Sequence, residues 1–116
     1  MKAVVIGASG IIGSAVARAF EEAGHAVFRA SRRGEVQVDI ADVASIRSMY
    51  DTLGTVDAVV CCAGEGTFAK LGDLSDEQLQ FTLSSKLMGQ VNLVREGMDR
   101  LADDGVFVLT SGMFSY

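Results

Sequence analysis

Apolar residues along this chain follow two different spacings. Short, nearly continuous apolar runs, typical of strands buried on both faces, alternate with segments whose apolar residues recur every three or four positions, as on one side of a helix. The strand-like runs cover residues 2–7, 25–30, 35–39, 56–62 and 105–110. This alternation, with short connections, predicts an α/β fold in which helices flank a doubly wound parallel sheet.

Local signals mark the ends of the expected helices. The first helix, from about 11 to 23, is followed by Gly24 as a C-cap, and the second is capped by Asp42 and ended by Gly54. The buried stripe of the first helix is expected to contain Ile12, Val16, Ala19, Phe20 and Ala23.

A third helical region is expected from about 76 to 101. Ser75 and Gln78 have the spacing of a capping box at its start. We expect this region to be broken near 82–85, and the fifth strand to follow at 105–110.

Three glycines separate the first strand from the first helix, at a G-x-x-G-x-x-G spacing. Glycine suits such a turn because it adopts unusual backbone angles and leaves room for a diphosphate at the first helical N–H groups. The residues expected to contact the phosphates are Gly7, Ser9, Gly10, Ile11, Ile12 and Gly13. Because glycines also end strands and tighten helix packing, the spacing alone leaves that structural role open.

Polar or small residues also follow the other strands. The carboxyl ends of parallel strands share one edge of the sheet, and open α/β folds bind ligands at that edge. The candidate groups are Ser31, Arg32 and Arg33 after the second strand, Asp39 and Ile40 after the third, Ala63 and Gly64 after the fourth, and Ser111 after the fifth. We expect them to converge with the glycine turn on one crevice.

The residues after the second strand bear on the choice between two dinucleotides. A carboxylate about 20 residues beyond the glycines marks recognition of the free 2′-hydroxyl of NAD. Here Ser31, Arg32 and Arg33 stand instead, and two guanidiniums suit the 2′-phosphate of NADP. The cofactor expected is therefore NADP rather than NAD, with a solvated basic turn as the alternative.

The third and fourth strands end in residues suited to an adenosine. Asp39 could hydrogen-bond the adenine amino group while Ile40 packs on the ring, or Asp39 could simply satisfy its own turn. Ala63 and Gly64 would bring bare backbone against a ribose, or form a strand-ending turn.

Composition and charge narrow the classes of ligand. The chain has 116 residues, of which 49% are hydrophobic and 22% charged, which predicts one globular domain over 1–116. Its net charge of −5 favours a small-molecule ligand over nucleic acid or an anionic membrane surface. No apolar run approaches the roughly 20 residues of a membrane helix, and the N-terminus has the pattern of a strand rather than a signal peptide, so a cytoplasmic location is expected.

The cysteines and the histidine do not form a metal-binding pattern. Cys61 and Cys62 are neighbours in a strand, point to opposite faces and cannot easily bridge each other. We interpret them as buried small residues, with a reactive thiol as the alternative. His25 is the single histidine, so no metal cluster is expected.

Together these motifs resemble the short-chain dehydrogenase/reductase family over the whole 116 residues. The glycine turn GASGIIG is similar to the form found in its extended and divergent branches, and Cys61-Cys62-Ala63-Gly64 stands where the family usually has N-N-A-G. The resemblance implies a Rossmann-like sheet of strand order 3-2-1-4-5 that lacks the family's C-terminal strands. It also implies hydride transfer between NAD(P) and a carbonyl or alcohol substrate.

The resemblance places two catalytic candidates. The family carries a catalytic asparagine in an N-x-x-G motif, and matching on Gly89 puts Lys86 at that position. Its ammonium could hold a water, the ribose or a substrate oxygen, or Lys86 could be a surface lysine. Ser111 is the candidate for the serine that orients the substrate carbonyl, although Gly112 could occupy that position instead.

The family's proton donor, the tyrosine of a Y-x-x-x-K motif, has no counterpart here, because Tyr116 is followed by no lysine. We therefore expect the nucleotide-binding part of a reductase that is inactive as this chain, or a non-catalytic dinucleotide-binding redox sensor or partner-binding module. The fifth strand would be an uncovered apolar edge. We expect either a fragment of a chain of roughly twice this length or a homo-oligomer formed through that edge.

Overall fold

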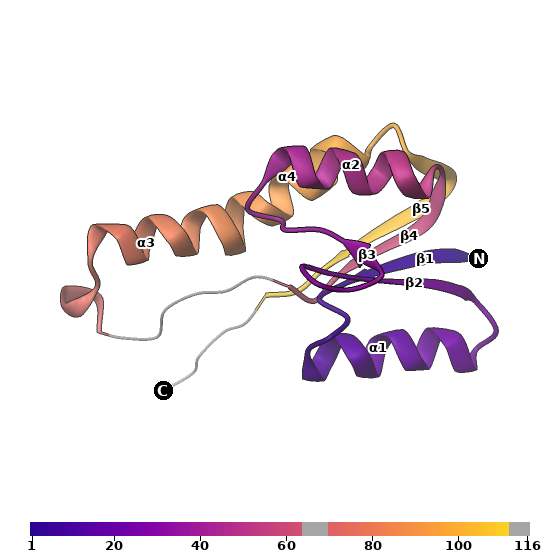
Figure 1. Cartoon of the computed structure of the whole chain (residues 1–116), viewed down its shortest axis with the longest axis horizontal. Coiled ribbons are helices and arrows are strands. Elements are labelled where there is room, and N and C mark those ends of the chain that lie inside the picture. Colours follow the sequence, from indigo (N-terminus) through magenta and orange to yellow (C-terminus); the bar gives the residue numbers. More distant parts are fainter. Residues whose placement is uncertain (64–69, 112–116) are drawn as a thin grey trace.

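A computed structural model describes residues 1–63 and 70–111 of the chain (Figure 1). Five parallel strands form one sheet of order β3-β2-β1-β4-β5, which confirms the expected order. The strands are β1 Lys2–Ile6, β2 Ala26–Ser31, β3 Val36–Gln37, β4 Val56–Cys61 and β5 Leu101–Leu109. The α-helices are α1 Ile11–Glu22, α2 Val43–Leu53, α3 Asp76–Thr82 and α4 Met88–Gly97, with a 3-10 turn, η1, at Leu71–Asp73 and a π-helical turn, η2, at Leu83–Leu87.

The helices cover the two faces of the sheet unequally. In Figure 1, α1 lies against one face while α2 and α4 lie against the other, and α3 extends beyond the ends of the strands. The larger buried cluster lies on the α2 and α4 side and includes Ile6, Val59 and Leu93; the smaller one lies on the α1 side and includes Val5 and Ala17. β1 contributes to both clusters, which explains its continuous apolar run.

The expected buried stripe of α1 is partly wrong. Ile12 is 62% exposed, and Ala19 and Ala23 are also exposed, whereas the residues buried in this helix are Gly13 and Ala17. A Cβ at Gly13 would collide with the carbonyl oxygen of Gly7. The helix therefore lies on the sheet along its smallest residues, and its larger apolar side chains are left at the margins of the contact.

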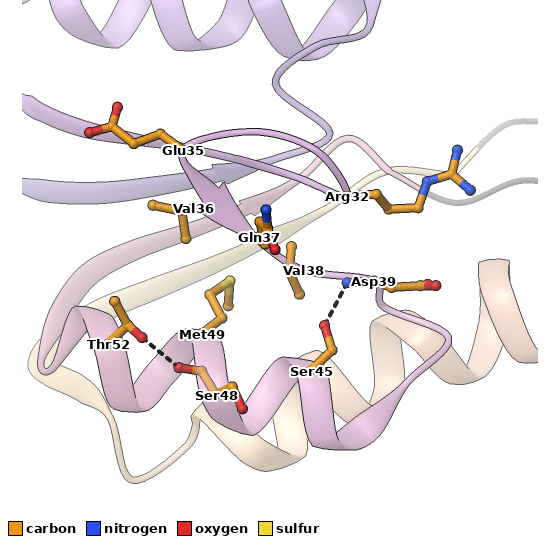
Figure 2. A pocket seen from close by; sticks show the side chains of 10 residues that line it. All are labelled: Arg32, Glu35, Val36, Gln37, Val38, Asp39, Ser45, Ser48, Met49 and Thr52. Atoms are coloured by element: carbon orange, nitrogen blue, oxygen red, sulfur yellow. Dashed lines mark hydrogen bonds between the residues drawn. The ribbon is translucent and has the colours of Figure 1, made fainter.

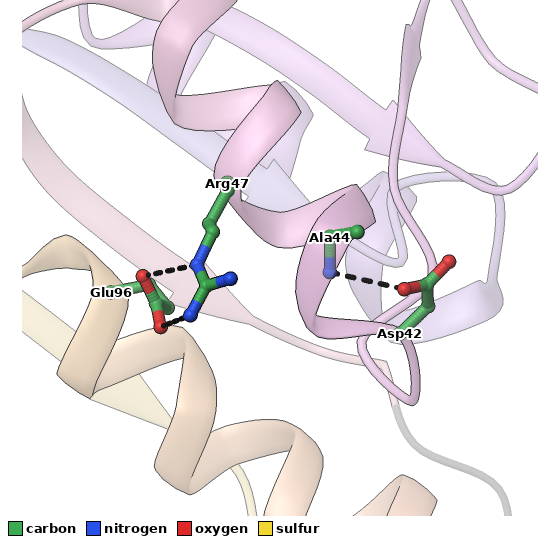
Figure 3. Close-up of polar contacts among 4 residues, drawn as sticks. All are labelled: Asp42, Ala44, Arg47 and Glu96. Carbon is green, nitrogen blue, oxygen red and sulfur yellow. Dashed lines mark hydrogen bonds and ion pairs between the residues drawn. The ribbon is translucent and has the colours of Figure 1, made fainter.

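The α2 helix begins and ends as expected. The Asp42 side chain accepts a hydrogen bond from the Ala44 nitrogen at 3.0 Å (Figure 3), and Gly54 follows the helix with φ of 69°. Figure 3 also shows a bidentate pair between Arg47 on α2 and Glu96 on α4, with both nitrogen–oxygen distances at 3.0 Å. The Arg47 guanidinium lowers the pKa of the Glu96 carboxyl.

A buried contact joins the same two helices more tightly. The fully buried Tyr50 donates its hydroxyl hydrogen to the Leu93 carbonyl oxygen at 2.7 Å, and burial raises the pKa of this phenol. A Cβ at Gly97 would collide with the Tyr50 ring and hydroxyl. Gly97 therefore sets how closely α4 approaches α2.

The third helical region agrees with the sequence prediction except at its C-terminal end. The capping box of Ser75 and Gln78 is present, and the expected break is the π-helical turn at Leu83–Leu87. The helix ends at Gly97 rather than near 101, and β5 begins at Leu101 rather than 105. Leu101 pairs with Val56, and a register shift then accommodates residues 102–105, which include Asp103 and Asp104, before regular pairing resumes at Val106.

β5 is an edge strand of this sheet, as expected from the sequence. Val106, Val108 and Leu109 are 45–47% exposed. None of the helices in the described part of the chain is long and apolar enough to cross a membrane.

The α2–α4 contact yields a stability prediction. Replacing Gly97 with alanine places a methyl group against the Tyr50 phenol, and such overpacking should lower the free energy of unfolding by about 1–3 kcal/mol. Gly72→Ala is the matched control, since no atom of the described residues lies within 4 Å of a Cβ there, and it should change stability by less than about 0.5 kcal/mol. Urea unfolding measures both, and equal stability of the two variants would contradict this account.

Candidate functional site

The turn after β1 requires glycine at its first position for two reasons. Gly7 has φ of 82°, a left-handed conformation that other residues rarely adopt. A Cβ on it would also lie 2.8 Å from the Ala63 nitrogen and the Cys62 carbonyl carbon, at the end of β4. The Gly7 nitrogen donates to the Ala30 carbonyl of β2 at 2.9 Å, so this residue holds the ends of three neighbouring strands together.

Gly10 has a different role, because the protein leaves space beside it. It is the N-cap of α1, with φ of −82° and ψ of 175°, which any residue can adopt, and no side chain caps the helix. A Cβ there would be 3.4 Å from the Gly7 carbonyl oxygen and more than 4 Å from the other residues that the structure describes, apart from its chain neighbours and its own helix backbone. Packing does not demand glycine at this position.

The N-terminus of α1 is accessible from outside. Ser9 and Gly10 are exposed, Ile11 is 93% exposed, and the first turn of the helix contains no acidic residue. The N–H groups of a first helical turn have no partner within the helix, and the helix dipole makes this end positive. The arrangement suits an anionic ligand.

A crevice of about 280 Å³ lies beside this helix end. It brings together eight of the residues singled out in the sequence: Gly7, Ser9, Gly10, Ser31, Arg32, Asp39, Ile40 and Ala63. Six other candidates do not line it, although the structure describes them: Ile11, Ile12, Gly13, Arg33, Lys86 and Ser111. Gly64 lies outside the described residues. The predicted convergence of the first four strand ends is therefore present in the structure.

The turn after β2 carries the two arginines at its surface. Arg32 and Arg33 are both exposed, and Arg32 lines the crevice. Ser31 is half-buried, its carbonyl accepts from the Val38 nitrogen at 3.0 Å, and a Cβ at Gly34 would lie 2.6 Å from its hydroxyl oxygen. This tight turn holds the arginine pair at the crevice end of β2.

The sequence left two roles open for Asp39, a hydrogen bond within its own turn and a contact with a ligand, and its position is compatible with both. One carboxylate oxygen accepts from the Ala41 nitrogen at 3.0 Å, which is the turn role, while the side chain is exposed and lines the crevice. Ile40 is only 5% exposed, and a Cβ at Gly89 would lie 2.8 Å from its Cδ1. Most of the Ile40 side chain is therefore buried against α4.

The structure shows a second hollow that the sequence did not indicate. A groove of about 590 Å³ lies between β3 and α2 and shares Arg32, Val38 and Asp39 with the crevice (Figure 2). Its α2 wall carries hydroxyl groups: Ser45 accepts from the Asp39 nitrogen at 2.7 Å, and Thr52 donates to the Ser48 carbonyl at 2.9 Å.

Two further crevice residues, Phe81 and Ser85, were missed by the sequence analysis. They come from α3 and the π-helical turn, four residues apart, and Ser85 is the polar residue that is buried, at 6% exposure, among the described residues. The expected break at 82–85 was the available signal, because π-helical turns often occur at functional sites.

Lys86 and Ser111 lie near a polar network rather than in the crevice lining. The Gln90 amide nitrogen donates to the carbonyls of Lys86 at 3.0 Å and Thr110 at 3.2 Å, while its oxygen accepts from the Thr110 nitrogen at 3.1 Å. The Thr110 hydroxyl donates to the Cys61 carbonyl at 2.6 Å. The network thus connects the π-helical turn with the ends of β4 and β5.

The cysteines differ in their surroundings. Cys61 is fully buried, and burial raises the pKa of its thiol, although a backbone hydrogen bond with Ala63 and the nearby Lys86 ammonium both lower it. Cys62 is half-buried and lines the crevice, so the expectation that both are buried holds for Cys61 alone. Both thiols are free, and the described residues contain no metal-binding group of three His, Cys, Asp or Glu.

Comparisons with known proteins place this geometry in context. The model of the NAD dependent epimerase/dehydratase family matches residues 3–115. A sepiapterin reductase of Chlorobaculum tepidum is 30% identical over 83 residues, which cover 66% of this chain and 34% of the reductase.

Solved structures resemble the chain over most of its length. The protein lin1944 of Listeria innocua has a TM-score of 0.88 and 46% identity, over 92% of this chain and 54% of that protein. A small-chain dehydrogenase in complex with NADPH has a TM-score of 0.89 and 30% identity, over 97% of this chain and 51% of its own. The chain thus spans about half the length of these solved structures.

The different surroundings of the glycines predict different costs of substitution. Gly13→Ala should lower the free energy of unfolding by about 3 kcal/mol, because its methyl group meets backbone that cannot move aside. Gly10→Ser should change it by less than about 0.5 kcal/mol, since serine is a favourable N-cap and the Cβ has room. Urea unfolding distinguishes the two, and similar losses at both positions would show that packing requires both glycines.

Proposed function

Because the chain belongs to the NAD dependent epimerase/dehydratase family and has the fold of short-chain dehydrogenases, we propose that it is the NADP(H)-binding part of a short-chain dehydrogenase/reductase. The observation that carries the proposal is the open N-terminus of α1, where Gly10 is exposed without being required by packing and faces the crevice. A diphosphate at this position would meet the unpaired N–H groups of the first helical turn.

We assign the rest of the dinucleotide to the remaining strand ends. The diphosphate lies over the turn formed by Gly7, Ser9, Gly10, Ile11, Ile12 and Gly13. The second carboxylate oxygen of Asp39 accepts from the adenine amino group, and Ala63 and Gly64 meet a ribose through bare backbone.

The preference for NADP rests on the turn after β2. Ser31, Arg32 and Arg33 surround the 2′ position of the adenosine ribose, where a 2′-phosphate accepts bidentate hydrogen bonds from guanidinium groups. A relative of 30% identity is solved in complex with NADPH, which supports this choice over NAD.

The proposed reaction is hydride transfer between the nicotinamide and a small carbonyl or alcohol substrate. In it, Ser111 orients the substrate oxygen through its hydroxyl, and the Lys86 ammonium holds a water, the ribose or the substrate oxygen. A second candidate is a non-catalytic dinucleotide-binding redox sensor or partner-binding module, and it is favoured by the position of Lys86 outside the described crevice lining. Because 1–116 alone is expected to be inactive in both cases, the assay requires a full-length protein that contains it. Oxidation of NADPH by that protein with a panel of carbonyl compounds would favour the enzyme, and nucleotide binding without turnover would favour the binding module.

We further propose that 1–116 folds as one cytoplasmic nucleotide-binding domain and associates through β5. The exposed valines of this edge strand favour pairing with another strand, including that of a second copy. Sedimentation at increasing protein concentration would detect such a homo-oligomer.

The arginine pair supplies the test of cofactor choice. Arg32→Ala and Arg33→Ala should each weaken NADPH binding by roughly 10- to 100-fold and leave NADH binding nearly unchanged, because only NADPH carries the 2′-phosphate. Arg95→Ala on α4 is the control for loss of one positive charge away from the crevice. Titration followed by nicotinamide fluorescence measures both affinities, and equal affinity of the unsubstituted protein for NADPH and NADH would rule out the assignment.

Gly10→Ser tests the phosphate position independently. Its Cβ and hydroxyl would occupy the space left for the diphosphate, so binding of NADPH and NADH should both fall by about 10-fold or more while the fold is retained. Unchanged affinity in a stable variant would mean that the diphosphate does not approach this helix end.

A further inference from the structure

Phe81 is an exposed aromatic residue whose position the packing of the protein does not explain. It is 45% exposed, and α3, on which it lies, contains no buried residue. In Figure 1 this helix extends past the ends of the strands, where it borders the crevice rather than the sheet. A large apolar side chain left in water is unfavourable unless another surface covers it.

The proposed placement of the dinucleotide leaves its base close to this residue. With the diphosphate at the end of β1 and the 2′ position at the end of β2, the adenosine half occupies the part of the crevice lined by the residues after β3. Phe81 on α3 and Ser85 in the π-helical turn line the same crevice. The base would therefore lie between the β3 end and the α3 side.

The apolar residue expected to pack on the ring is largely unavailable. Ile40 is 5% exposed and its side-chain tip packs at Gly89, and Val38 is 4% exposed. A planar base needs an apolar surface of its own size, and Phe81 presents one in the crevice lining.

We infer that Phe81 stacks on the adenine base of the dinucleotide and forms the outer wall of its pocket, with Ser85 beneath it. The inference rests on the proposed function. Stacking on an aromatic side chain recognises the flat face of a base, while Asp39 is placed to recognise its edge. Binding of the base therefore needs both sides of the crevice.

The local backbone supports this orientation. Phe81 and Ser85 are four residues apart, which places their side chains on the same side of the helical segment. The π-helical turn that contains Ser85 is held by the Gln90 amide bonded to the Lys86 carbonyl. Leu79 and Leu83, two residues to either side of Phe81, are exposed to a similar degree but do not line the crevice.

Alanine substitution separates base stacking from the rest of the site. Phe81→Ala should weaken NADPH, NADH and 2′,5′-ADP by the same factor, roughly 5- to 100-fold, because all three carry adenine. Leu83→Ala, the matched control, should leave all three affinities within about two-fold. Calorimetric titration of each ligand into the purified protein gives these values.

A tryptophan variant reports the contact directly, because the chain contains no tryptophan. In Phe81→Trp the indole fluorescence should be strongly quenched by 2′,5′-ADP, which lacks the nicotinamide, while affinity is retained. Leu83→Trp should show little change. Full affinity in Phe81→Ala, or an unquenched Phe81→Trp that binds 2′,5′-ADP, would overturn the inference. If the unsubstituted protein binds no nucleotide at all, the proposed function fails first and the inference fails with it.

Discussion

The contact of backbone against backbone at the glycine turn is the constraint on which the rest of the structure depends. Gly7 leaves no space for a Cβ against the end of β4, and Gly13 leaves none against the carbonyl of Gly7. Together they bring β1, β4 and α1 close enough that the carboxyl ends of the strands form one crevice instead of separate loops. The crevice proposed to bind the nucleotide is thus a consequence of how closely the central strands and the first helix approach one another.

The order and type of most elements could be predicted from the sequence because local signals and apolar periodicity agreed. The caps of α2 and α3 were found in this way, as were the buried strands. The buried face of α1 could not be predicted in this way. Hydrophobicity favours burial of Ile12 over Gly13, whereas the short distance between helix and sheet leaves room only for Gly13 at the contact. The start of β5 was missed because polar residues occupy a register shift that only pairing with β4 reveals.

The residues that line the crevice also fall into two groups, those that the sequence could predict and those that it could not. Residues that directly follow strands were predictable, since strand topology alone gathers them at one edge. The contribution of the third helical region was not, because a π-helical turn changes which side chains face the crevice, and no rule of spacing gives that rotation in advance. Ile40 shows the opposite case. It lines the crevice, as its place after the third strand predicted, but its side chain is mostly buried against α4 and offers little surface to a ligand.

The double role of the Gln90 side chain has a mechanical consequence. One amide group, accepting on one side and donating on the other, binds both the π-helical turn and the end of β5. The Gln90 amide therefore joins the π-helical turn, which carries Ser85 into the crevice lining, to Thr110, the residue that precedes Ser111. Loss of this one side chain would remove hydrogen bonds from two segments that are twenty residues apart in the chain.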